Sequence, residues 1–171
     1  VISTLETPED VAHFRDVILW DESREMLGAA QLDYLDRTFR TSVAKGQPWR
    51  LIANQVIMAK VALPNMGEVL TAEQIAAQDS PYVEGMVGFS ALGLPFNLDA
   101  WDGFPAARER LYMSAKKAGA RLVTVTGDTH TAWANTLYDA AGDQRGVEFG
   151  CTSITSPGIG SVIKDVPNLG P

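Results

Sequence analysis

The sequence predicts an α/β fold in which a mixed β-sheet is flanked by helices. Amphipathic helical patterns alternate with β-branched, apolar segments along the 171 residues, and this alternation is typical of helices that pack on a sheet. The last two strand-like segments are joined by a short turn, which adds a hairpin to the sheet. A chain of this length is enough for one domain with a sizeable core.

Capping residues and apolar periodicity predict three helices. Thr7 and Pro8 have the residue types of an N-cap and a first helical position, so a short helix is expected to begin there. A longer helix is predicted over residues 28–44, before Gly46, and another ends at Gly119. The apolar stripes of the two longer helices are formed by Leu32, Leu35, Phe39 and Val43, and by Phe104, Ala107, Leu111 and Ala115.

The strands are predicted from apolar runs. The continuous run over residues 49–63 favours a strand covered on both faces. A second strand is expected over residues 121–126, and two more are expected around a turn at 141–144. Residues 64–102 contain many Pro and Gly residues, so we expect a long irregular excursion with one short helix near residues 71–78.

Charge and cysteine content exclude several function classes. Lys and Arg number 14 against 21 Asp and Glu, a net charge of −7, and no basic block is present. No nucleic-acid-binding surface is therefore expected. Cys151 is the only cysteine, so the chain has no internal disulfide. No apolar run approaches the length of a membrane span, and an acidic chain needs bound cations to attract an anionic substrate.

The stretch TGDTH holds the candidate site. Asp128 and His130 come directly after the strand predicted over residues 121–126, at the end of a strand where α/β sheets bind ligands. Residues two positions apart can point to the same side, and a carboxylate with an imidazole is a suitable pair of metal ligands. Alternatively, Asp128 is a helix N-cap and His130 a buried, hydrogen-bonded histidine.

Four stretches, in this order, resemble the C-terminal half of the PhoD-type alkaline phosphatase/phosphodiesterase family, a branch of the calcineurin-like metallophosphoesterases. They are REMLGAAQLDYLDRTFRTSVAKGQPWRLIANQVIMA, NLDAWDGFPAARERL, VTVTGDTHTAWANTLYD and GVEFGCTSITSPG. The resemblance implies that residues 1–171 are the C-terminal part of a PhoD-like metallophosphatase domain. It also implies that the sheet is part of an α/β/β/α sandwich.

The resemblance further implies hydrolysis of phosphate monoesters and diesters with bound metals, calcium and iron in particular. It makes Asp128 and His130 metal ligands, with protonation of the leaving group as an alternative catalytic role for His130. Asn54 and Gln55 match a polar pair that could line the site or only satisfy backbone groups. Asp102 is expected to cap the following helix rather than to orient the excursion.

The family's earlier metal motifs have no counterpart in residues 1–50. We therefore expect a piece of a larger enzyme that binds metal weakly and has little activity alone. A different class of function, a non-catalytic interaction or assembly domain that keeps the fold, is the alternative. In either case a second copy could cover apolar edges, so a homo-oligomer is one expected partner besides a phosphate ester. By resemblance alone, the compartment would be periplasmic or extracellular.

Overall fold

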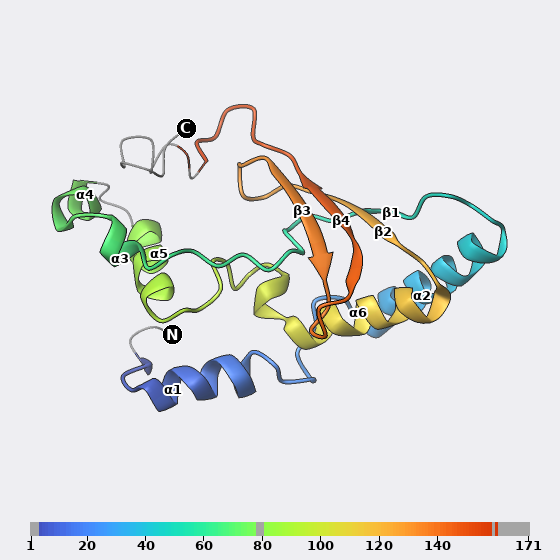
Figure 1. The fold of residues 1–171 in the computed structure, drawn as a ribbon, viewed down its shortest axis with the longest axis horizontal. Coiled ribbons are helices and arrows are strands. Elements are labelled where there is room, and N and C mark those ends of the chain that lie inside the picture. The colour runs from blue at the N-terminus through green and yellow to red at the C-terminus, as the bar shows by residue number, and fades with distance from the viewer. Residues whose placement is uncertain (1–3, 78–80, 159, 161–171) are drawn as a thin grey trace.

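A computed structural model describes the chain except for residues 1–3, 78–80, 159 and 161–171. Figure 1 shows the strands gathered in one sheet beside α2 and α6, with α3, α4 and α5 apart from them. The described elements are, in chain order, α1 (Pro8–His13), a π-helical turn (Phe14–Ile18), α2 (Ala29–Ala44), β1 (Leu51–Ala53), α3 (Met66–Val69), α4 (Ala72–Ala77), α5 (Pro81–Ala91), a 3-10 turn (Trp101–Gly103), α6 (Pro105–Ala118), β2 (Leu122–Thr126), β3 (Trp133–Tyr138) and β4 (Gln144–Gly150).

The sheet confirms the predicted mixed α/β fold. Its strand order is β1-β2-β4-β3. β1 and β4 both run parallel to β2, whereas β3 runs antiparallel to β4. The predicted hairpin joins β3 to β4, and the pairing register shifts between Leu137 and Tyr138, where the strand enters the turn.

α2 and α6 cover one face of this sheet, as the two predicted amphipathic helices should. Phe39 of α2 and Leu111 of α6 share a buried cluster with Leu122 of β2 and Leu137 of β3. Burial of each such side chain stabilises the fold by about 1.5–3 kcal/mol relative to exposure. Gly119 ends α6 with φ 69°, the left-handed conformation predicted for its C-cap.

The opposite face of the sheet is apolar and exposed within the described residues. Leu51 is 63% exposed, Val125 38% and Phe149 52%. The strand register places Ala53, Val125 and Phe149 side by side across this face. We call it the bare face. Parallel strands are usually covered on both faces, and the exposure of Leu51 contradicts the expectation that the first strand is covered on both.

Thr7 begins α1 as predicted. Its hydroxyl accepts from the backbone N–H of Asp10 at 3.1 Å, and the Asp10 carboxylate accepts from the backbone N–H of Thr7 at 2.9 Å. This reciprocal pair satisfies two of the N–H groups that the first turn of a helix leaves unpaired. The Thr7 hydroxyl also donates to the Asp10 carboxylate at 2.7 Å, and this bond, together with the bond from the Thr7 N–H, holds the pKa of Asp10 below its ordinary value.

The long apolar run over residues 49–63 forms a strand only at Leu51–Ala53, so the predicted long strand is wrong. Ile57, Met58 and Ala59, which follow this strand, are nevertheless buried. A side chain provides the hydrogen bonds that a neighbouring strand would otherwise make. The backbone N–H groups of Met58 and Ala59 donate to the carboxylate of Glu148 at 2.6 and 3.1 Å. A backbone satisfied in this way needs no ladder of strand hydrogen bonds.

A buried ion pair extends this network toward α6. Nη1 of Arg108 donates to Met58 O at 3.1 Å and to Oδ1 of Asp102 at 2.6 Å. Oδ2 of Asp102 accepts from the backbone N–H of Val61 at 2.7 Å. Asp102 does not cap α6, whose N-cap is Phe104 without a side-chain cap, so that expectation is wrong. Asp102 instead ties the end of the excursion to the chain just before it.

The excursion contains more helix than the sequence indicates. α4 occupies the place of the one short helix expected, but α3 and the 11-residue α5 lie there too. Met66 of α3 packs with Val83 and Met86 of α5 in a second buried cluster. A glycine such as Gly85 costs a helix about 1 kcal/mol relative to alanine. The apolar packing between α3 and α5 outweighs this cost.

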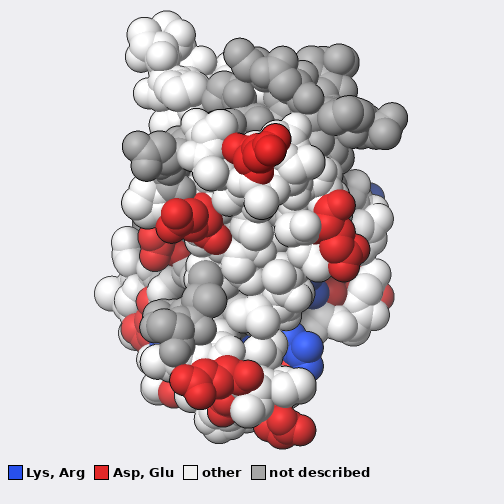
Figure 2. All heavy atoms as spheres, turned by 90° about the vertical axis from the view of Figure 1, so that its left-hand side faces the viewer, with Lys and Arg blue, Asp and Glu red and all other residues white. Residues whose placement is uncertain are grey.

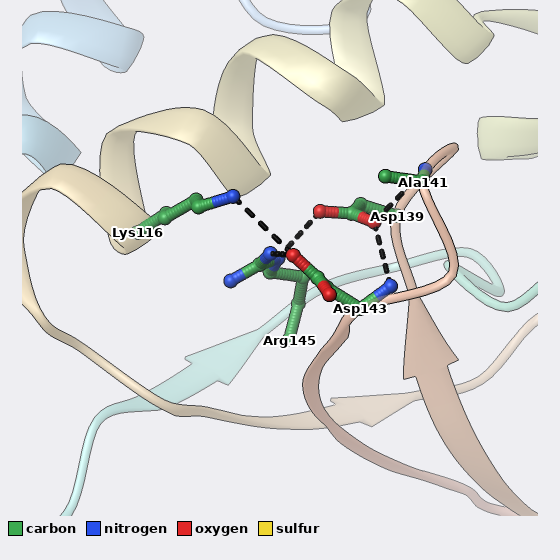
Figure 3. Close-up of polar contacts among 5 residues, drawn as sticks. All are labelled: Lys116, Asp139, Ala141, Asp143 and Arg145. Carbon is green, nitrogen blue, oxygen red and sulfur yellow. Dashed lines mark hydrogen bonds and ion pairs between the residues drawn. The ribbon is translucent and has the colours of Figure 1, made fainter.

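The turn between β3 and β4 is fastened to α6 by charged side chains (Figure 3). Arg145 binds Asp139 at 2.7 Å and Asp143 at 2.5 Å. Lys116 of α6 reaches Asp143 at 3.3 Å. Burial acts to raise the pKa of Asp139, but the bonds from Arg145 and from the N–H groups of Asp143 and Ala141 outweigh it and hold that pKa below its ordinary value.

Asp139→Asn should remove a contribution to stability that depends on pH. Because the folded pKa is lowered, this contribution is complete above the ordinary aspartate pKa of about 3.9 and is lost as pH falls through the folded pKa. The variant should therefore have a lower free energy of unfolding at neutral pH and a weaker pH dependence between about pH 5 and 3. Urea unfolding measures both, with exposed Asp33→Asn as the control. An unchanged pH dependence would contradict the assignment.

Arg108→Met should destabilise the fold strongly, because it leaves the carboxylate of Asp102 buried without its cation. Breaking one side of a buried pair typically costs about 3–5 kcal/mol. Arg37→Met on the exposed surface of α2 is the matched control and should change stability by no more than about 0.5 kcal/mol. Chemical unfolding measures the free energy of unfolding of both variants. If Arg108→Met lowered it by less than about 1 kcal/mol, the pair would contribute no more than an exposed ion pair does, and the prediction would be contradicted.

Candidate metal-binding site

The parallel strands β1, β2 and β4 end at one edge of the sheet, which we call the carboxyl edge. Asn54 follows β1, Gly127 follows β2 and Cys151 follows β4. The backbone N–H of Asn54 donates to Val125 O at 2.9 Å, and that of Cys151 donates to Thr126 O at 2.8 Å. These bonds hold the ends of the three strands beside one another, at the position where α/β sheets bind ligands.

The turn after β2 has an unusual backbone. Asp128 has φ 72° and His130 has φ 56°, and they are the non-glycine residues with positive φ in the part of the chain that the structure describes. The N–H of Thr129 donates to Gly127 O at 2.9 Å, which closes a tight turn around Asp128. Left-handed backbone at non-glycine residues costs free energy and gathers at functional sites. The strain thus coincides with the two residues that the sequence singles out.

Neighbouring groups hold this turn in place. The N–H of Gly127 donates to Gln55 O at 3.4 Å, which links the turn to the chain after β1. The indole N–H of Trp133 donates to Oγ1 of Thr129 at 2.7 Å. The Trp133 ring packs against the main core, so this side chain connects the core to the turn. Trp133 is therefore a packing residue that also positions Thr129.

The ring of His130 has a defined orientation. Its Nδ1 lies 3.2 Å from Pro157 O. A carbonyl oxygen can only accept a hydrogen bond, so Nδ1 must carry the proton in this contact. In the neutral ring, Nε2 then has a free lone pair. Histidines that bind metals typically donate their other N–H to a carbonyl in this way. The exposed ring also contradicts the alternative that His130 is a buried histidine.

Asp128 has an exposed carboxylate. In the described part of the chain, no hydrogen bond or ion pair engages it, so it does not act as the N-cap considered in the sequence. Asp128 and His130 are thus suitable as metal ligands by residue type and by availability. They do not complete a site: among the described residues, no group of three or more His, Cys, Asp or Glu side chains could hold a metal ion.

The structure places Asn54 and Gln55 beside the turn, but in different ways. Nδ2 of Asn54 donates to Val56 O at 2.5 Å, so its amide satisfies a neighbouring backbone group. The side chain of Gln55 is exposed, while its backbone carbonyl receives the N–H of Gly127. Gln55 is therefore the one of the pair whose side chain is available to a ligand.

The surface charge agrees with the composition. On the face shown in Figure 2, acidic side chains are scattered among uncharged ones and basic side chains occupy little of the area. No continuous basic surface for nucleic acid is visible on this face. Among the helices that the structure describes, none is both long and apolar enough to pass through a membrane.

Comparison with known proteins identifies the family of this chain. The family model of PhoD-like phosphatases matches residues 4–168. The chain belongs to the PhoD-like phosphatase family. Alkaline phosphatase D of Bacillus subtilis (strain 168) is 34% identical over 118 residues, which make up 61% of this chain and 20% of that relative. The chain thus matches about a fifth of the length of this curated relative. No solved structure matches it.

The family assignment confirms the resemblance drawn from the four sequence stretches. Sequence reasoning on this PhoD-like chain nevertheless missed several residues that position the turn. Glu148 could have been noticed as a single carboxylate within the apolar strand VEF. Pro157 acts through its backbone carbonyl, for which a sequence gives no signal.

Proposed function

We propose that this PhoD-like chain contributes the metal-binding turn of an enzyme that hydrolyses phosphate monoesters and diesters. Calcium and iron are the metals in this proposal. Family membership and the relative named alkaline phosphatase D support the phosphatase chemistry. Asp128 and His130 are the proposed metal ligands, because they share a strained turn at the carboxyl edge.

One observation indicates which nitrogen of His130 would meet a ligand. Its Nδ1 is engaged by Pro157 O, so the neutral ring can bind a cation or accept a proton through Nε2 but cannot donate a proton there. Protonation of a leaving group would require the charged ring. Both roles would therefore use Nε2, and the role of metal ligand is the one proposed because the exposed carboxylate of Asp128 shares the turn with His130.

The remaining groups follow from the chemistry of phosphate esters. Bound cations would offset the negative charge of the ester and make a water molecule acidic enough to attack phosphorus. The chain has a net charge of −7 and cannot provide a positive field by itself. Asp128 would hold a cation through its oxygens, and Gln55 would offer its amide to the substrate or to water at the same edge.

Two side chains are too few for such a centre. Calcium typically takes about 6–8 oxygen ligands, and the described residues provide no third acidic, histidine or cysteine ligand beside Asp128 and His130. We propose that other polypeptide of a longer catalytic domain supplies the rest. The chain alone should then bind metal weakly and turn over little substrate.

Titration of the chain with Ca²⁺ or Fe³⁺ should perturb the backbone signals of residues 127–131 first, because both proposed ligands lie in this turn. Loss of a group that only orients a metal ligand typically lowers metal affinity roughly 10–100-fold. Asp128→Asn and His130→Gln, which each remove a proposed ligand, should lower the affinity at least as much. Asp33→Asn, an exposed carboxylate on α2, is the control. If the metal-dependent changes in these backbone signals were the same in both variants as in the native chain, the ligand assignment would be contradicted.

Turnover tests the chemistry separately from the ligands. With added calcium and iron, slow hydrolysis of p-nitrophenyl phosphate should be lost in Asp128→Asn and kept in Asp33→Asn. Hydrolysis that is indifferent to Asp128 would contradict a catalytic site at this turn. A panel of monoesters and diesters would then define the substrate class.

The bare face favours a second candidate function, an assembly domain without catalysis. Its apolar side chains lie on parallel strands that are usually covered, and Leu51, Val125 and Phe149 are exposed on it. We propose that in the isolated chain a second copy covers this face. The assembly role does not require metal binding, whereas the catalytic role does.

Phe149→Glu should shift the isolated chain from dimer to monomer, because it places a charge in the middle of the bare face. Ile154→Glu is the control, since Ile154 is 100% exposed and lies beyond β4. Light scattering over a concentration series measures the molar mass. A native chain that is monomeric at every concentration would rule out a second copy as the partner.

A further inference from the structure

The segment Thr152–Gly158, which follows β4, lies against the turn that carries His130. Pro157 O accepts from Nδ1 of His130 at 3.2 Å. The hydroxyl of Thr152 donates to the backbone carbonyl of His130 at 3.1 Å. One segment, distant in sequence, therefore contacts both the ring and the backbone of the same histidine.

The segment is held in this position by its own contacts. At its start, the N–H of Cys151 donates to Thr126 O at 2.8 Å, which joins it to the end of β2. Within it, the hydroxyl of Ser153 donates to the carbonyl of Ser156. Pro157 follows with a fixed φ. Its carbonyl is thus presented by a short segment that these contacts restrain.

Gly158 makes the close approach possible. A Cβ at this position would lie 2.3 Å from the backbone O of His130 and 2.9 Å from Oγ1 of Thr131. The nearer atom belongs to the backbone, so rotation of a side chain cannot relieve the clash. Any larger residue at position 158 must push the segment away from His130 or distort the turn.

We propose that Pro157 and Gly158 are positioning residues for His130. The carbonyl of Pro157 selects the neutral ring form with the proton on Nδ1, and Gly158 allows that carbonyl to come within hydrogen-bonding distance. Nε2 of this exposed residue is then left unprotonated. The use of Nε2 rests on the proposed function, whereas the selection of the ring form does not.

The selection has a physical advantage for a ligand. A freely rotating imidazole exchanges its proton between two nitrogens and samples several ring orientations, and each must be restricted when a cation binds. A carbonyl that fixes the position of the proton and the orientation of the ring before binding lowers the entropic cost of binding. Groups that orient metal-binding histidines are expected to act in this way. Thr152 adds to the effect, because it stabilises the left-handed backbone of His130, φ 56°.

Long-range proton–nitrogen NMR of the nitrogen-15-labelled full chain tests the proposal without metal. At about 2 pH units above the ordinary histidine pKa of about 6.5, the spectrum should show His130 with a protonated Nδ1 and an unprotonated Nε2. His13, an exposed residue at the end of α1, should show the averaged signals of an unrestrained ring. Gly158→Ala should move His130 to the same averaged pattern.

Gly85→Ala is the matched control, because a Cβ there meets no atom within 4 Å; it should leave the His130 signals unchanged. If Gly158→Ala lowers overall stability, Thr152→Val provides a second test at a side chain and Thr152→Ser should restore the native signals. A native His130 that already shows averaged signals, or a Gly158→Ala variant with native signals, would overturn the proposal. Failure of metal binding with a fixed ring would count against the proposed function alone.

Discussion

The fold depends on one buried carboxylate, that of Glu148. It is fully buried in β4 and accepts from two backbone N–H groups, those of Met58 and Ala59, and from Nδ2 of Asn135. A buried charge is tolerated only when such bonds replace its water. Because the donors come from the chain after β1 and from β3, this single side chain fixes both to the central part of the sheet. The position of Gln55 beside Gly127 follows from that anchor.

The sequence predicted the elements whose signals are local. Thr7 and Gly119 mark helix ends by their own conformational preferences, and the stripe of Leu111 and its neighbours follows from helical periodicity. The hairpin and the strand before Gly127 were predicted for the same reason. Each of these signals lies within its own element or turn, where residues a few positions apart contact one another.

The elements that were mispredicted depend on distant partners. Residues 57–59 look like a strand because they are apolar, yet the N–H groups of Met58 and Ala59 bind Glu148, 90 and 89 residues away. Asp102 looks like a helix cap because it precedes α6, yet its partners are Arg108 and the N–H of Val61. α5 was not predicted because its glycines disfavour a helix. The helix forms because Met86 packs against Met66, a contact between distant residues.

The candidate site combines both kinds of information. The identity of Asp128 and His130 and their place after a strand could be read from the sequence, but the left-handed backbone of both residues could not. That backbone is tolerated because the surroundings determine it from several sides: Trp133 binds Thr129, and Thr152 binds His130 O. A turn held this firmly loses little conformational entropy when a ligand arrives. The strain is therefore easier to explain as preorganisation of the two side chains than as an accident of a loose surface loop, which would relax to ordinary backbone angles.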